Sequence, residues 1–190
     1  MRPEWGRRSG RLKGFDYTTP GLYFVTICTR ERAGVLGDLH AGSIVLSPIG
    51  EIVRQTWAEI PGHFPNVDLD EYVVMPNHLH GLLCIVDVTV GAQHPAPAVL
   101  GRCAAPLRQP PQRPTRPRVI PGSLGAIVRT FKSASTRRAN LRSGTPGASF
   151  WQRNYYEHVI RDEEGLNRVR AYIKENPLRW SLDKENPALS

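Results

Sequence analysis

The 190-residue sequence predicts an α+β domain in which an antiparallel, ferredoxin-like sheet carries helices on one face. Segments with strand and helix patterns follow one another as strand, helix, strand, strand, helix, short strand and helix. This order is typical of split β-α-β folds. With 40% apolar residues, the chain can also build a single core of ordinary size.

Four stretches favour β-strands. Gly21–Thr29 is rich in β-branched and aromatic residues and follows a proline. Residues 70–76 and 78–86 form two more strands, which a tight Pro-Asn turn joins. Residues 150–160 form a fourth, extended segment. Between the first strand and the first helix, residues 30–47 are predicted as a turn followed by a short extended piece.

Three helices complete the pattern. Ser47 is a good N-cap for the first helix, whose apolar stripe reaches Ile60 before a Pro-Gly pair. The second helix begins at Ser123. Asp162 caps the third, which has two glutamates in its first turn. We expect this last helix to end at Asn176, because a proline disfavours helical geometry in the residue before it.

The composition divides the chain into four parts. Residues 1–13 form a basic arm, residues 14–180 the folded domain, and residues 181–190 a C-terminal tail. Inside the domain, residues 87–122 are rich in proline and arginine and show no sustained periodicity. We interpret them as a flexible insertion.

The charge of the chain points to a polyanionic partner. The formal net charge is +8, with 25 Lys and Arg against 17 Asp and Glu. Between Gly91 and Phe150 there is no acidic residue, whereas ten are basic. Such a clustered excess attracts nucleic acid by counterion release, although a solvated, solubility-promoting surface is the plainer alternative.

Nothing in the sequence predicts a membrane partner. No stretch approaches the roughly 18 apolar residues of a membrane span. The basic N-terminus lacks the apolar centre of a signal peptide. We therefore expect a cytoplasmic protein.

Two histidines stand one residue apart in an apolar strand, in the stretch VVMPNHLHGLLCI. His78 and His80 point to the same face of the strand, while Leu79 points to the other. Two neutral imidazoles this close can bind one divalent metal. Two hydrogen-bonded structural histidines, or an exposed strand face, explain the same pattern equally well until a third ligand is found.

The last helix offers candidates for that third ligand and for a nucleophile. Tyr172 lies beside the apolar stripe of this helix, with Asn176 one turn later and Arg168 one turn earlier. A hydroxyl, an amide oxygen and a cation on one line would suit phosphoryl chemistry. The plainer alternatives are a packing tyrosine and a helix-ending asparagine.

These motifs together resemble a known family. MPNHLHGLL and FWQRNYYEHVIRDEEGLNRVRAYIKENPLRW are similar to the single-tyrosine transposases of the HUH endonuclease superfamily, and most to the REP-associated tyrosine transposases. The pattern is His-hydrophobic-His followed far downstream by Tyr-x-x-x-Asn-Pro. GFDYTTPGLYFVTICTRER resembles the first strand of the family. The resemblance covers about residues 14–180 in the family's order, and the insertion at 87–122 departs from it.

The resemblance implies an HUH endonuclease fold and a role for each matched residue. His78, His80 and Asn176 would be ligands of Mg²⁺ or Mn²⁺, and Tyr172 would be the nucleophile. The enzyme would cleave single-stranded or hairpin DNA through a 5′-phosphotyrosine link, rejoin strands, and be associated with the nucleoid. The resemblance is consistent with either a monomer or a homodimer.

The chemistry is coherent with the residues. A cation at the phosphate lowers the barrier to attack, and a phosphotyrosine stores the bond energy for religation. We interpret further basic residues as contacts to flanking DNA backbone, namely Arg168, Arg129, Lys132, Arg137 and Arg138. Two alternatives stay open: a catalytically inactive relative that only binds DNA or RNA, and a metallonuclease that uses water as the nucleophile.

Overall fold

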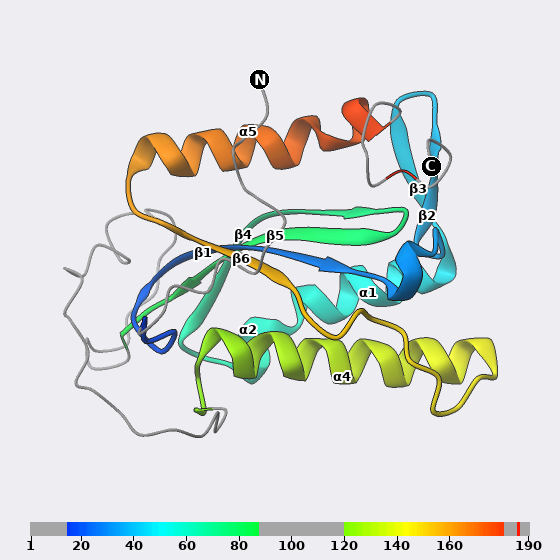
Figure 1. The fold of residues 1–190 in the computed structure, drawn as a ribbon, viewed down its shortest axis with the longest axis horizontal. Coiled ribbons are helices and arrows are strands. Elements are labelled where there is room, and N and C mark those ends of the chain that lie inside the picture. The colour runs from blue at the N-terminus through cyan, green and yellow to red at the C-terminus, as the bar shows by residue number, and fades with distance from the viewer. Residues whose placement is uncertain (1–14, 88–119, 181–185, 187–190) are drawn as a thin grey trace.

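A four-stranded antiparallel sheet is the centre of the computed structural model, which describes residues 15–87, 120–180 and 186 (Figure 1). The strand order is β4-β5-β1-β6. The strands are β1 (Gly21–Cys28), β4 (Val67–Met75), β5 (His78–Ile85) and β6 (Tyr156–Ile160). A helix connects β1 to β4 and another connects β5 to β6, which is the split β-α-β connectivity of ferredoxin-like folds. The predicted α+β class with an antiparallel sheet is confirmed.

The helices lie on both faces of the sheet, which corrects the expectation of helices on one face. They are α1 (Pro48–Ala58), α2 (Ile60–His63), α4 (Leu124–Ser143) and α5 (Glu163–Arg179). The crossover helices α1 and α4 share one face, and α5 covers the other (Figure 1). The physical reason is visible in β5, where every residue is buried. A strand that is apolar on both sides needs cover on both sides.

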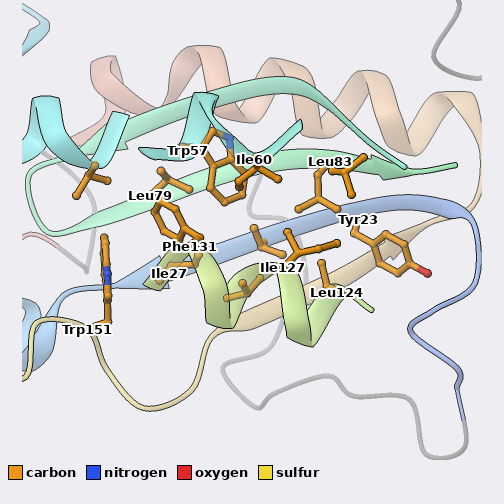
Figure 2. Close-up of a cluster of buried hydrophobic side chains, with 14 of the residues drawn as sticks. Tyr23, Ile27, Trp57, Ile60, Leu79, Leu83, Leu124, Ile127, Phe131 and Trp151 are labelled. Atoms are coloured by element: carbon orange, nitrogen blue, oxygen red, sulfur yellow. The ribbon is translucent and has the colours of Figure 1, made fainter. Parts of the chain in front are cut away.

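The larger core lies between the sheet and the pair α1 and α4 (Figure 2). Trp57 of α1 and Phe131 of α4 meet there edge to face, with ring centroids 5.1 Å apart. Leu79 of β5 is fully buried beneath them. Gly81 is required at its position because an added Cβ would come within 2.3 Å of the Trp57 ring.

A smaller core holds α5 on the opposite face. Its helical stripe consists of Leu166, Val169 and Ile173, as the sequence predicts. These side chains pack on Phe24 of β1 and Leu82 of β5. The even-numbered residues of β5 therefore face α5, and the odd-numbered residues face α1 and α4.

Two segments differ from the sequence prediction. Within residues 30–47, a hairpin of β2 (Gly37–His40) and β3 (Ser43–Leu46) replaces the single extended piece. Its turn needs left-handed backbone at Ala41 and Gly42, and alanine gives no signal for that conformation. Only the end of the segment 150–160 pairs as a strand, β6, although Trp151 forms an isolated bridge to Thr29.

The last helix also runs on past its predicted end. It continues through Pro177 to Arg179. The conformational restriction on Asn176 is a preference that packing can override. Trp180, directly after the helix, is 5% exposed, so burial of this ring holds the final turn in place.

The two predicted N-caps, Ser47 and Asp162, are confirmed, and Ser123 also caps its helix. The side chain of Ser47 accepts from the backbone N–H of Gly50, and Ser123 and Asp162 do the same at the starts of α4 and α5. The proposed arm at 1–13, nearly all of the insertion at 87–122 and nearly all of the tail at 181–190 lie outside the described residues. Within the described residues, no helix combines the length and the apolar character that crossing a membrane requires.

Candidate active site

The two histidines of β5 form a buried pair on the face covered by α5. His78 is 1% exposed and His80 is 5% exposed. Their Nε2 atoms lie 2.9 Å apart. Strand alternation predicts that the two side chains share a face, and the geometry shows that the two nitrogens converge on one point.

Burial keeps both rings neutral. It lowers the pKa of His78 to about 3, with the positive charge of Arg32 as a second cause. Burial, followed by the neighbouring His78, holds the pKa of His80 well below its usual value. Neutral imidazole is the form that binds metals, so this environment favours the metal-binding state of both residues.

Hydrogen bonds at the far side of each ring set which nitrogen carries the proton. The Nδ1 of His78 lies 2.7 Å from Oδ1 of Asn77, which only accepts. His78 therefore donates from Nδ1, and its Nε2 presents a lone pair. The Nδ1 of His80 lies 2.8 Å from the hydroxyl of Thr26, which can either donate or accept.

Thr26 thus allows two states of the pair. If its hydroxyl donates to His80, then Nε2–H of His80 donates to His78 and the pair is satisfied by itself. If its hydroxyl accepts from His80, two lone pairs face each other across 2.9 Å, an arrangement that a cation between them would stabilise. Neighbouring ligands of an octahedral Mg²⁺ at about 2.1 Å lie about 3 Å apart, which matches this spacing.

Tyr172 of α5 reaches this pair from the neighbouring helix. Its hydroxyl is 3.3 Å from Nε2 of His80, and the two ring centroids are 5.2 Å apart. The ring also meets Phe24 edge to face. The structure therefore brings the tyrosine to the histidines, although His80 and Tyr172 are 92 residues apart in the chain.

Asn176 lies on the same line of α5, between two residues that touch the histidines. Tyr172, one turn earlier, contacts His80, and the ring of Trp180, one turn later, lies 5.8 Å from that of His78. Asn176 is 2% exposed, and its Oδ1 has no hydrogen-bond partner in the described part of the chain. A buried acceptor without a partner is costly, so this oxygen fits a third ligand.

The candidate donor set is therefore two imidazoles and one amide oxygen. Among the residues that the structure describes, no three His, Cys, Asp or Glu side chains form a metal site. The set carries no net charge, so a bound divalent cation would keep its full charge for an anionic substrate.

Two ion pairs fix the position of α5 on the sheet. The guanidinium of Arg170 binds both carboxylate oxygens of Asp70 on β4, at 3.1 and 2.5 Å. Lys174 pairs with Glu71 on the same strand at 2.9 Å. Because α5 carries Tyr172, these pairs also set the distance between the hydroxyl and the histidines.

A groove of about 490 Å³ lies at the β4 edge of the sheet, and its lining includes none of His78, His80, Tyr172 and Asn176. The β2-β3 hairpin, β4 and the end of α5 line it, and Val73 in its wall is the strand partner of His80. Arg54 and Lys174 supply two cations to the lining.

The predicted DNA-contact residues of α4 lie away from this site, on the opposite face of the sheet. Arg138 donates to the hydroxyl of Thr56 in α1 and pairs with Glu59, the residue that follows α1. Lys132 donates to the backbone carbonyls of Gln152 and Arg153. Both residues therefore hold the fold together. The remaining three are exposed, Arg129 and Arg137 on α4 and Arg168 on α5, where Arg168 pairs with Glu164.

Sequence reasoning missed three residues of the site. Thr26 contacts His80 only because the register of β1 and β5 pairs them, and that register is a long-range property. The sequence indicates Asn77 only as a turn residue. Trp180 lies beyond the predicted end of the helix. The position of Asn77 directly before the His-x-His pattern was the one available signal.

The fold matches that of a transposase. The solved structure of a REP-associated tyrosine transposase bound to a REP hairpin superposes with a TM-score of 0.54, over 90% of this chain and 74% of that one, at 17% identity. At this identity the match establishes the class of fold. No protein-family model matches the chain.

A sequence relative establishes the family. A protein of Haemophilus influenzae, described as uncharacterized, is 39% identical over 182 residues, which cover 94% of this chain and 92% of the relative. The chain belongs to the same family as this Haemophilus protein.

Proposed function

We propose that the protein is a metal-dependent, single-stranded DNA endonuclease and strand transferase of the transposase class, with Tyr172 as its nucleophile. The observation that carries the proposal is the position of the Tyr172 hydroxyl, 3.3 Å from a histidine nitrogen that itself converges with a second histidine. A nucleophile, a site for a cation and a basic protein are the parts that phosphodiester cleavage requires.

His78, His80 and Asn176 would hold the divalent ion, Mg²⁺ or Mn²⁺. When bound, that ion would neutralise charge on the scissile phosphate and orient it. Residues of the protein itself would orient the two imidazole rings and exclude water. Asn77 and Thr26 fix the orientation of the two rings, and the burial of the pair excludes the water that would compete with the tyrosine.

In the proposed reaction, the oxygen of Tyr172 attacks the phosphorus in line. A tyrosine–phosphorus bond forms, the bond from phosphorus to the 3′-oxygen breaks, and the tyrosyl proton leaves while the 3′-oxygen gains a proton. The product is a 5′-phosphotyrosine and a free 3′-hydroxyl. Attack by a 3′-hydroxyl on the same phosphorus reverses the step and joins strands without ATP.

Hairpin-forming DNA is the substrate we propose. The transposase with the same fold was solved with a REP hairpin, and the net charge of +8 suits a nucleic-acid ligand. The exposed cations Arg129, Arg137 and Arg168 would contact backbone phosphates outside the site. Lys132 and Arg138 would add to the positive field while keeping their structural partners.

One experiment separates this proposal from its alternatives. Single-stranded oligonucleotides from the DNA that flanks the gene are incubated with the protein in Mn²⁺, and covalent product is detected by denaturing gel and mass spectrometry. The unsubstituted protein should form a tyrosine-linked adduct, and Tyr172→Phe should form none. Because the Tyr172–His80 contact is long for a hydrogen bond, the Phe variant should keep its fold.

The other outcomes identify the other functions. Cleavage that persists in Tyr172→Phe, without an adduct, would indicate a metallonuclease that uses water. Salt-sensitive binding without cleavage in any metal would indicate a binding protein. The second alternative has support in the structure, because the state in which His80 donates to His78 satisfies the pair without a metal.

A further inference from the structure

A cavity of about 790 Å³ lies against the second half of α4, on the face of the sheet opposite to α5 (Figure 1). Residues of α4 between positions 132 and 141 form one wall, and residues 146–153 form the other. Within the described part of the chain, no residue of the candidate active site lines it. Its volume is in the range of sites that bind small molecules and cofactors.

The second wall is fixed in place by hydrogen bonds. The indole N–H of Trp151 donates to the hydroxyl of Ser135 on α4 at 2.9 Å. The backbone N–H of Arg30, just after β1, donates to the carbonyl of Phe150 at 2.8 Å. A wall that is already ordered loses little freedom when a ligand binds, so the cavity is preorganised.

The lining combines an aromatic ring, an exposed apolar side chain and cations. Phe150 is half-buried, and its ring meets that of Trp151 edge to face with centroids 4.8 Å apart. Leu141 is 85% exposed. Arg137 and Arg153 are exposed as well, and neither guanidinium forms an ion pair with any residue that the structure describes. The lining contains no Asp or Glu. It therefore complements a ligand that is flat and apolar in one part and anionic in another.

We propose that this cavity binds an unpaired nucleotide of single-stranded DNA, with the base against Phe150 and the flanking phosphates on Arg137 and Arg153. Aromatic rings stack on every base, and guanidinium groups offer paired N–H donors that match phosphate oxygens. An acidic peptide would satisfy the two arginines but would bring no flat ring to the aromatic wall. The inference rests on the function proposed above for the identity of the strand as DNA.

The cavity and the histidine pair border the same end of β1. The backbone N–H of Gln152, in the second wall, donates to the carbonyl of Cys28 at 2.9 Å, and Cys28 is the register partner of His78. The three segments lie side by side, so the backbones of Gln152 and His78 are about 10 Å apart, or two interstrand spacings. A nucleotide in the cavity would therefore be anchored near the end of the sheet where cleavage is proposed.

Two pairs of variants test the proposal. Phe150→Leu removes the flat ring and keeps an apolar side chain. Phe64→Leu is its matched control, because Phe64 packs against the same core and lies outside the lining of the cavity. Arg137→Ala removes a cation from the cavity, and Arg142→Ala removes one from the last turn of the same helix, outside the lining. Both arginines are exposed, so neither change should disturb the fold.

The readout is the fluorescence anisotropy of a labelled oligothymidylate of about 12 nucleotides, measured in EDTA so that no cleavage is required. A second probe of the same length carries abasic sites, which keep the phosphates and lack the bases. Phe150→Leu should weaken binding of the oligothymidylate by roughly fivefold or more, as for other base-stacking residues, and leave binding of the abasic probe within about twofold. Arg137→Ala should weaken binding of both probes equally and lower the slope of log affinity against log salt by about 0.7. The two control variants should stay within about twofold of the unsubstituted protein on both probes.

Other results would overturn the inference. An equal loss on both probes in Phe150→Leu, or an equal loss in Phe64→Leu, would show that the ring acts on the structure and does not contact a base. Equal losses in Arg137→Ala and Arg142→Ala would show that only the net charge matters. Unchanged binding in both cavity variants would point to another occupant, an acidic peptide or a second copy of the chain. If the expected binding pattern is found and no adduct forms, the proposed catalysis fails while the cavity keeps its role in binding.

Discussion

Replacing Asn176 with leucine should change stability in opposite directions with and without metal. In the metal-free protein, Oδ1 of Asn176 is a buried acceptor without a partner among the described residues. Such a group costs about 1–3 kcal/mol. Leucine has a similar shape and no polar atom, so Asn176→Leu should raise the free energy of unfolding by about that amount.

With metal bound, the unsubstituted protein should become more stable than Asn176→Leu. Saturation at 100 times the dissociation constant stabilises a native protein by about 2.7 kcal/mol. For a chain of this size each kcal/mol corresponds to about 2–4 °C, so the unsubstituted protein should gain about 5–11 °C in Tm on adding Mn²⁺. Asn176→Leu, with one ligand fewer, should gain much less.

Thermal unfolding followed by circular dichroism, with EDTA and with excess Mn²⁺, measures both effects. Asn140→Leu is a suitable control, because Asn140 is also buried but its Nδ2 donates to the carbonyl of Ala148 at 2.8 Å. That variant should lose about 1–2 kcal/mol and keep the full response to Mn²⁺. An Asn176→Leu protein that is less stable than the parent in EDTA, or responds equally to Mn²⁺, would refute the reasoning.

Two further predictions concern the attachment of α5 and the buried histidines. Arg170→Ala leaves the Asp70 carboxylate, which is 8% exposed, without its partner, so it should lower the free energy of unfolding in urea by about 2–3 kcal/mol and slow adduct formation. Arg168→Ala on the same helix should lower it by less than about 0.5 kcal/mol. Equal losses in the two variants would contradict this prediction. Burial lowers the pKa of both site histidines, so below about pH 6.5 the unfolded chain binds more protons than the folded protein does. The free energy of unfolding of the metal-free protein should therefore fall as the pH is lowered, by at most about 1.4 kcal/mol per pH unit for each histidine. A His78→Asn/His80→Asn protein should show a smaller fall between pH 6.5 and 5, and an unchanged fall would count against the predicted shifts.

The parts of the fold that sequence could predict are those governed by local periodicity and capping. Period-two alternation placed His78 and His80 on one face, and the spacing of four placed Tyr172 and Asn176 on one line. The structure shows both arrangements. Their catalytic and metal-binding roles stay predictions.

The parts that sequence could not predict depend on contacts between distant segments. Thr26 meets His80 through strand register, and Thr29 donates to the carbonyl of Asn77, the residue directly before His78. The cover of α5 on the second face of the sheet is likewise a property of the assembled core. Local patterns carry no information on such pairings.

The continuation of α5 through Pro177 determines how far the chain can be shortened. A fragment that stopped at Asn176 would contain both histidines, the amide and the tyrosine, yet it would lack the indole of Trp180 that lies against His78. Water would then reach the ring, its pKa would rise towards the ordinary value, and protons would compete for the nitrogen at neutral pH. The boundary of the smallest usable fragment is therefore set by a tryptophan that takes no part in the chemistry.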